Sequence, residues 1–302
     1  MMSYSLQPVP PFRLDLTVWA LRRVPTNEID CWDGRTYCRV LAIRDEPVYV
    51  SVVQSMPQET PELVVSVTGP GSIAATDVEI ASILTKLLGL DVDLNDFYLI
   101  ARQDIRLSEL ASRFIGFKPP RMESVFEALI NGVACQQISL KVGIALLNRL
   151  SARYGISVDG RHAFPQPKDL ADASAEELKQ LGFSTRKAEN IMSISRAIVD
   201  GQLKLEKLDD LDDDLVETAL RDICGVGRWT AQYVELRGMG RLNVYPADDV
   251  GSQIKLQQWL NLGERPNYIG VHRIIDRWAP YRGLIYFHLL LESQFRQGLF
   301  QI

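Results

Sequence analysis

The chain lacks several features that mark whole classes of protein. Its 302 residues include four cysteines, none in a C-x-x-C pair, and three histidines that lie far apart in sequence. We therefore expect neither a disulfide framework nor a zinc site. The chain also has no uninterrupted run of 18 apolar residues, and no basic segment followed by an apolar one near Met1, so neither a membrane span nor a secretory signal is expected. These absences predict a cytoplasmic protein with reduced thiols.

The chain also lacks the excess of positive charge that is typical of proteins that coat nucleic acids. Its net charge is −5. The charge is uneven, because residues 221–302 carry ten Lys or Arg side chains against seven Asp or Glu. A local basic surface can hold a few phosphates while the rest of the molecule stays acidic. The composition therefore permits DNA binding without establishing it.

Residues 1–90 and 91–302 carry different patterns. In the first part, apolar residues alternate with others in three stretches, which is the two-residue period of half-buried strands. These stretches contain Leu14, Leu16 and Val18; Val48, Val50 and Val52; and Leu63, Val65 and Val67. We predict an antiparallel sheet in residues 1–90, with a helix from about Asp77 to Leu88 packed on one face. Residues 91–302 show helical spacing instead and are predicted to be all-α, so the fold class is α+β.

Helical segments are clearest in four places after residue 120. They run from Met122 to Cys135, from about Ser139 to Arg153, from Ser184 to Val199 and from Val250 to Leu260. Two more segments flank a short turn, and their apolar residues recur at helical spacing. These residues are Leu215, Ala219, Leu220 and Ile223 before the turn, and Trp229, Tyr233 and Leu236 after it.

The turn itself reads Gly225-Val226-Gly227 and predicts a helix-hairpin-helix. Glycine allows another backbone to approach closely, and the second helix would begin with free N–H groups that suit a phosphate oxygen. The candidate phosphate-binding residues are Gly225, Val226, Gly227, Arg228 and Thr230. A Gly-x-Gly turn between helices is also common where no DNA is bound, so the turn alone leaves both interpretations open.

A second segment makes the pattern more specific. The hairpin is followed, 24 residues after Gly225, by Asp249 within the run Val-Tyr-Pro-Ala-Asp-Asp-Val-Gly of residues 244–251. Together the two segments resemble the helix-hairpin-helix (HhH-GPD) DNA glycosylases, and among them the 3-methyladenine DNA glycosylase II, or AlkA-like, type. The resemblance covers residues 90–295 and is weak over the sheet. It implies two helical subdomains with the active cleft between them, and a monomer.

The resemblance implies that Asp249 is the catalytic group. Breaking an N-glycosidic bond builds positive charge on the sugar, and a fixed carboxylate stabilises that state or orients the attacking water. An alkylated purine is already cationic and leaves readily, so one aspartate can be enough. On the residues alone, the favoured interpretation is that Asp248 and Asp249 cap the helix that starts at Val250. With the resemblance, we expect Asp249 to be catalytic and Asp248 to have the capping or turn role.

Two aromatic residues follow the hairpin. Bifunctional relatives carry a lysine where this chain has Trp229, and that lysine attacks the sugar to form a Schiff base. Tryptophan has no such chemistry, so we predict a monofunctional enzyme without lyase activity. Trp229 and Tyr233 lie one helical turn apart and would line the pocket for the extruded base, because aromatic faces attract cationic purines. Ordinary core packing is the alternative for both.

Two positions depart from the family pattern. At the junction of Gln136 and Gln137, the family places a residue that wedges into the duplex gap, and Gln137 stands where the best-known pattern has leucine. The alternative is a polar helix junction. Late in the final helix, the family has a tryptophan two residues after a histidine, but here His288 is followed at that distance by Leu290. Both departures leave the lesion preference open.

These residues together predict a DNA glycosylase that removes alkylated purines of the 3-methyladenine and 7-methylguanine type from double-stranded DNA. The enzyme would be nucleoid-associated and would contact no membrane. No cofactor and no iron–sulfur cluster are expected, since no cysteine follows Asp249. The resemblance allows a sodium or potassium ion at the hairpin carbonyls from Arg221 to Val226. The alternatives are a non-catalytic damage sensor, a purely structural protein, and a glycosylase for uracil, hypoxanthine or an oxidised base.

Overall fold

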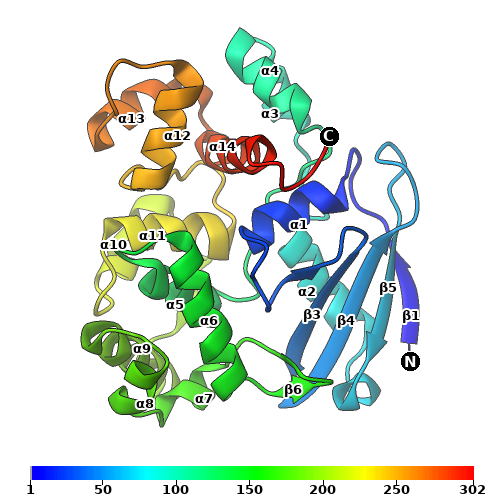
Figure 1. Cartoon of the computed structure of the whole chain (residues 1–302), viewed down its shortest axis with the longest axis vertical. Helices are drawn as coiled ribbons and strands as arrows, with labels where there is room; N and C mark the ends of the chain where they lie inside the picture. The colour runs from blue at the N-terminus through cyan, green and yellow to red at the C-terminus, as the bar shows by residue number, and fades with distance from the viewer. Residues whose placement is uncertain (1) are drawn as a thin grey trace.

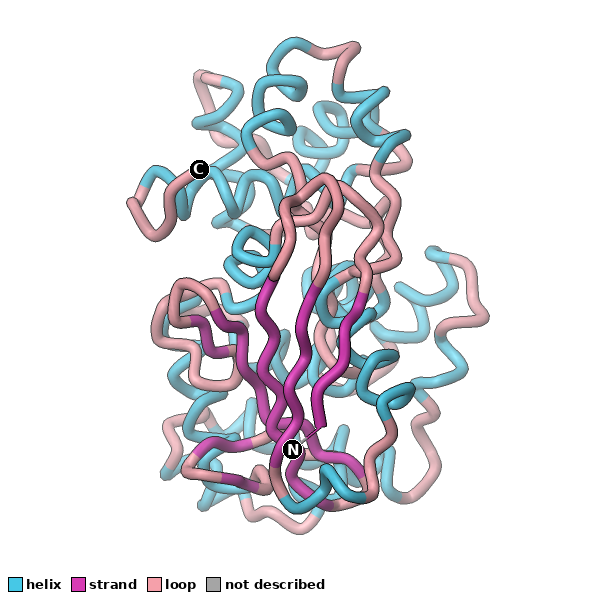
Figure 2. The backbone as a smooth tube through the Cα atoms, turned by 90° about the vertical axis from the view of Figure 1, so that its right-hand side faces the viewer, coloured by secondary structure: helices cyan, strands magenta, loops and turns pink. Residues whose placement is uncertain are grey.

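The computed structural model describes residues 2–302 and sets a five-stranded antiparallel sheet beside a body of helices (Figure 1). The sheet has the order β1-β5-β4-β3-β2. Its strands are β1 (Met2–Leu6), β2 (Cys31–Trp32), β3 (Thr36–Ile43), β4 (Glu46–Gln54) and β5 (Leu63–Thr68). Figure 2 shows these strands side by side, with most of the helices behind them. The predicted alternation in residues 48–52 and 63–67 is confirmed, because β4 and β5 bury every second residue.

The first predicted strand is wrong. Residues 14–22 form the helix α1 (Leu14–Arg22), in which all residues except Asp15 are buried. One side of α1 packs on the sheet through Leu14 and Val18, while Leu16 and Trp19 pack on helices from the far end of the chain. A helix buried on both sides shows no single apolar stripe, and its apolar residues fell by chance at alternate positions.

The remaining helices follow the prediction closely. Thr76 caps α2 (Asp77–Leu88), Ser124 caps α5 (Val125–Cys135), Ser139 caps α6 (Leu140–Tyr154) and Ser184 caps α9 (Thr185–Val199). The other α-helices are α3 (Asn95–Ala101), α4 (Ile105–Arg113), α7 (Pro167–Ala171), α8 (Ala175–Gln180), α10 (Asp213–Arg221), α11 (Arg228–Val234), α12 (Val250–Leu260), α13 (Tyr268–Ile275) and α14 (Arg282–Arg296). Short helical turns occur at η1 (Pro70–Ile73), η2 (Leu205–Leu208), η3 (Glu235–Met239) and η4 (Asp276–Trp278).

Three local details differ from the prediction. The helical part contains a small hairpin, β6 (Ser157–Val158) and β7 (Arg161–His162), whose Asp-Gly turn has both residues at positive φ. The helix after the glycine turn ends at Val234 and continues as the π-helix η3. The buried stripe of α10 is shifted by one residue, because Val216 is buried and Leu215 is 57% exposed.

The buried apolar residues form three cores. The sheet core joins β3, β4 and β5 to α1 and α2. A first helical core joins α5, α6, α9, α10 and α11, and a second joins α3, α4, α12, α13 and α14. The predicted α+β class is therefore confirmed. The division of the chain at residue 90 stays a prediction, because α1 contributes to both the sheet core and the second helical core. Within residues 2–302, no helix has the length and apolarity to cross a bilayer.

Candidate functional site

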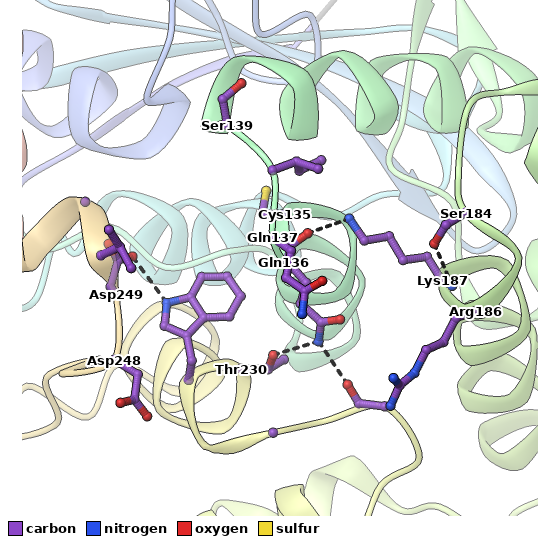
Figure 3. A pocket seen from close by; sticks show the side chains of 16 residues that line it. Cys135, Gln136, Gln137, Ser139, Ser184, Arg186, Lys187, Thr230, Asp248 and Asp249 are labelled. Atoms are coloured by element: carbon purple, nitrogen blue, oxygen red, sulfur yellow. Dashed lines mark hydrogen bonds between the residues drawn. The ribbon is translucent and has the colours of Figure 1, made fainter. Parts of the chain in front are cut away.

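A cavity of about 780 Å³ lies where the two helical cores meet. Its walls come from the turn between α5 and α6, the start of α9, the glycine turn with α11, and the start of α12 (Figure 3). The lining residues include Cys135, Gln136, Gln137, Lys187, Gly225, Gly227, Trp229, Thr230, Asp248, Asp249 and Gly251. The structure thus brings the glycine turn, the predicted catalytic residue and the predicted wedge to one place.

The carboxylate of Asp249 is held from both sides. Its Oδ1 accepts the backbone N–H of Ser252 at 2.7 Å, which makes Asp249 the N-cap of α12. Its Oδ2 accepts the indole Nε1–H of Trp229 and the hydroxyl of Tyr286, each at 3.2 Å. Three donors therefore fix one side chain at the cavity wall.

The turn role expected for Asp248 is confirmed, because this residue lies in the turn closed by the hydrogen bond from the N–H of Asp249 to the carbonyl of Pro246 at 2.9 Å. The capping role of Asp248 is wrong. Its Oδ2 accepts Nε of Arg228 at 2.7 Å instead, and the guanidinium of Arg228 also lies 3.7 Å from the centroid of the Tyr268 ring. The helix cap comes from Asp249, as the preceding contacts show. Asp248 therefore tethers the glycine turn to the start of α12.

The glycine turn has the backbone that the sequence predicts. Gly225 has a φ of +80°, and a Cβ there would lie 2.0 Å from Nδ2 of Asn190. Gly227 is exposed and is the N-cap residue of α11, and a Cβ there would meet no atom within 4 Å. The side chains of Val226 and Thr230 are buried, so these two residues would contact a phosphate through the backbone and not through their side chains.

The two glutamines of the predicted wedge differ. Gln137 is exposed and has a φ of +56°, a conformation that non-glycine residues adopt rarely. Gln136 is not free, because its Nε2 donates to the carbonyl of Gly225 at 2.9 Å and to Oγ1 of Thr230 at 3.0 Å. The side chain of Gln136 therefore bonds the α5–α6 turn to the glycine turn (Figure 3), and its wedge role stays a prediction. Lys187 also bonds the α5–α6 turn, because its Nζ donates to the backbone carbonyl of Gln136 at 2.7 Å.

Trp229 and Tyr233 stack with their ring centroids 5.5 Å apart and their planes at 27°. Trp229 lines the cavity, as predicted. Tyr233 lies behind it and is 3% exposed, with its hydroxyl accepting a hydrogen bond from Arg23 at 2.7 Å. The prediction that both rings form the wall therefore needs correction: Tyr233 supports the wall from within the core.

Sequence reasoning missed Tyr286 and Arg23. On the final helix, the family pattern indicated His288 and Leu290. His288 is fully buried among phenylalanines, however, and burial lowers its pKa to about 4. Tyr286, one helical turn before Leu290, is the residue that reaches the site. Its aromatic side chain on a helix named by the family pattern was the signal available. Arg23 had no such signal, since it follows residues 14–18, whose alternating pattern predicted a strand.

The arrangement suits a reaction that develops positive charge. A half-buried carboxylate lies beside an aromatic wall, at the edge of a cavity of about 780 Å³. The thiol of Cys135 is a poor nucleophile there, because burial raises its pKa. Among residues 2–302, no cluster of His, Cys, Asp and Glu side chains has the arrangement of a metal site.

Comparison with known proteins agrees with this geometry. Residues 130–280 match the model of the HhH-GPD superfamily of base excision DNA repair proteins. A DNA-3-methyladenine glycosylase of Bacillus subtilis is 30% identical over 70% of this chain and 71% of its own length. YfjP of the same organism is 32% identical over 52% of this chain, and the chain spans about half, 55%, of that relative. A 3-methyladenine DNA-glycosylase from Archaeoglobus fulgidus superposes with a TM-score of 0.83, at 26% identity, over 97% of this chain and 98% of its own.

Proposed function

Since the chain belongs to the HhH-GPD superfamily of base excision DNA repair proteins, we propose that it is a DNA-3-methyladenine glycosylase. It hydrolyses the N-glycosidic bond of alkylated purines, of the 3-methyladenine and 7-methylguanine type, in double-stranded DNA. The observation that carries this proposal is Asp249, fixed by three donors at the wall of a cavity that the glycine turn also borders.

The reaction proceeds on a nucleotide turned out of the duplex. The extruded base enters the cavity beside Trp229, and its sugar lies near Asp249. As the bond to the base breaks, the carboxylate stabilises the positive charge that develops on the sugar, and water completes the hydrolysis. An alkylated purine departs as a neutral base, so the reaction needs no strong general acid. Trp229 offers no amine for a Schiff base, so the product is an abasic site in an intact strand.

The glycine turn holds the DNA backbone. The exposed N–H groups at the start of α11 point to open space beside Gly227, where a phosphate oxygen can approach the backbone closely. Gln137 fills the gap that the extruded nucleotide leaves, since its unusual backbone conformation holds it exposed at the cavity. Gln136 bonds the turn that carries Gln137 to the glycine turn, so the wedge residue and the phosphate-binding turn are held in a fixed relation.

Three further properties follow from this function. A sodium or potassium ion would bind the hairpin carbonyls between Arg221 and Val226; that of Gly225 already accepts Gln136, so the others supply the ligands. An ion there would bring positive charge close to the phosphate. The reaction needs no other cofactor. The enzyme acts as a monomer in the cytoplasm, associated with the nucleoid.

The test compares the wild type with Asp249→Asn and with Asp248→Asn as the matched neighbouring control. Release of methylated purines from alkylated duplex DNA is measured together with binding to duplex DNA that contains an abasic site. We expect Asp249→Asn to lose excision and keep binding, while Asp248→Asn keeps excision. A wild type that binds but releases no purine would indicate a sensor or another lesion, which a panel with uracil, hypoxanthine and 8-oxoguanine substrates identifies. A covalent complex trapped by borohydride would contradict the monofunctional mechanism.

A further inference from the structure

Tyr286 comes from the last helix, α14. Its hydroxyl donates to Oδ2 of Asp249 at 3.2 Å. Burial and the nearby charge of Asp249 raise the pKa of Tyr286 well above its usual value. The hydroxyl therefore stays protonated across the physiological pH range and remains a donor to the carboxylate.

We propose that Tyr286 is a positioning residue, which together with Trp229 occupies Oδ2 of Asp249 so that Oδ1 is the oxygen presented to the sugar and the water. This inference rests on the proposed glycosylase function. Nothing in the family motif names this residue, because it stands 37 positions after Asp249 on a different helix.

The hydrogen bonds of the carboxylate support this division between its two oxygens. Each oxygen has two lone pairs in the plane of the group. On Oδ2 both are taken, by Nε1 of Trp229 and by the hydroxyl of Tyr286. On Oδ1 the N–H of Ser252 takes one and leaves one free. The free lone pair is therefore on Oδ1.

The approach to Oδ1 is open because the neighbouring residue is a glycine. Gly251 lines the cavity, and a Cβ there would lie 3.1 Å from Oδ1 of Asp249 and 3.5 Å from Nζ of Lys255. Any larger residue would therefore crowd this oxygen at a position that borders the cavity. Glycine leaves Oδ1 uncrowded on this side, while Oδ2 is bonded to Trp229 and Tyr286.

The experiment removes the hydroxyl with Tyr286→Phe and uses Tyr281→Phe as the matched control. Tyr281 precedes the same helix and packs its ring against Phe97, away from Asp249. Excision of methylated purines is measured in single turnover, with binding to abasic-site duplex DNA and thermal unfolding. We expect Tyr286→Phe to slow excision about 10- to 100-fold, the range for losing a hydrogen bond to a charged group. Binding should stay within about twofold, and the melting temperature should stay near that of the wild type.

A second variant tests the role of Oδ1. Gly251→Ala keeps both donors to Oδ2 but places a methyl group beside Oδ1, so it should also slow excision. If the wild type is active and Tyr286→Phe is equally active, the inference is overturned and the proposed function stands. Parallel losses of rate, DNA binding and thermal stability in Tyr286→Phe would also overturn it, since they indicate a structural role. A Gly251→Ala enzyme as fast as the wild type would exclude Oδ1 as the presented oxygen. A wild type that releases no methylated purine overturns the proposed function instead, and this inference with it.

Discussion

The two glycines of the hairpin should respond to alanine in opposite ways. At Gly225 the φ of +80° disfavours any residue with a Cβ, which costs about 1–2 kcal/mol. The new Cβ would also lie 2.0 Å from Nδ2 and 2.3 Å from Cγ of Asn190, a side chain that is 5% exposed and has little room to move. Crowding of this kind costs about 1–3 kcal/mol. Gly225→Ala should therefore destabilise the protein by about 2–5 kcal/mol in total.

Gly227→Ala is the matched partner, because its Cβ meets no atom of the protein within 4 Å. Its stability should change by less than about 1 kcal/mol, the usual range for an N-cap substitution. The methyl group would, however, stand where a phosphate oxygen approaches the backbone, so affinity for abasic-site duplex DNA should fall about tenfold or more.

Denaturant unfolding and DNA binding separate the two effects. Gly225→Ala should lose stability first, and Gly227→Ala should lose DNA affinity at nearly unchanged stability. Normal DNA binding by Gly227→Ala would refute the close approach of phosphate to this turn. Wild-type stability of Gly225→Ala would refute the steric argument at Asn190.

Three other predictions follow from the same contacts. Burial, with Glu217 and Asp213 nearby, raises the pKa of Glu235 from 4.5 to about 8, so the folded protein binds the extra proton between these values and its stability falls as the pH rises through them. Glu235→Gln should remove this slope from unfolding free energies measured over that range, and an unchanged slope would locate the proton elsewhere. Gln137→Ala should slow excision about tenfold at an unchanged melting temperature, because the side chain is exposed and an extruded nucleotide loses its wedge; equal rates would leave Gln137 as a polar junction. Replacing sodium and potassium by a large organic cation should weaken binding to abasic-site DNA without lowering the melting temperature, and unaltered binding would argue against an ion at residues 221–226.

The sequence was most informative where function needs a fixed local pattern. The glycine turn and its distance to Asp249 are local features, so the backbone at Gly225 and the position of Asp249 at the cavity were both predictable. The helix starts at Ser139 and Ser184 were equally readable, since each serine accepts the N–H of the residue three positions on. The cap before Val250 was assigned to the wrong neighbour, because Asp248 and Asp249 are the same capping residue type.

Features that depend on distant packing were missed. Helix α1 has no amphipathic stripe because two cores cover it, so its apolar residues indicated a strand. Tyr286 reaches Asp249 only after α14 packs against α12. Gln136 has its partners 89 and 94 residues away, at Gly225 and Thr230, and nothing in its neighbourhood distinguishes it from Gln137. These contacts are set by tertiary structure, which no short window of sequence contains.

Asp249 shows why helix capping and catalysis are compatible roles for one residue. As two competing interpretations of the sequence they appear exclusive, but the cap takes only one lone pair of Oδ1 and leaves the other for the reaction, so both roles serve one purpose. The cap engages Oδ1 with Ser252 and fixes the side chain at the start of α12, where the helix dipole also favours negative charge. Trp229 and Tyr286 then fix Oδ2 from two other helices. A carboxylate that is held in this way does not have to reorient as the sugar becomes positive, so little reorganisation opposes the reaction. The cap is thus part of what would make Asp249 an effective catalytic group.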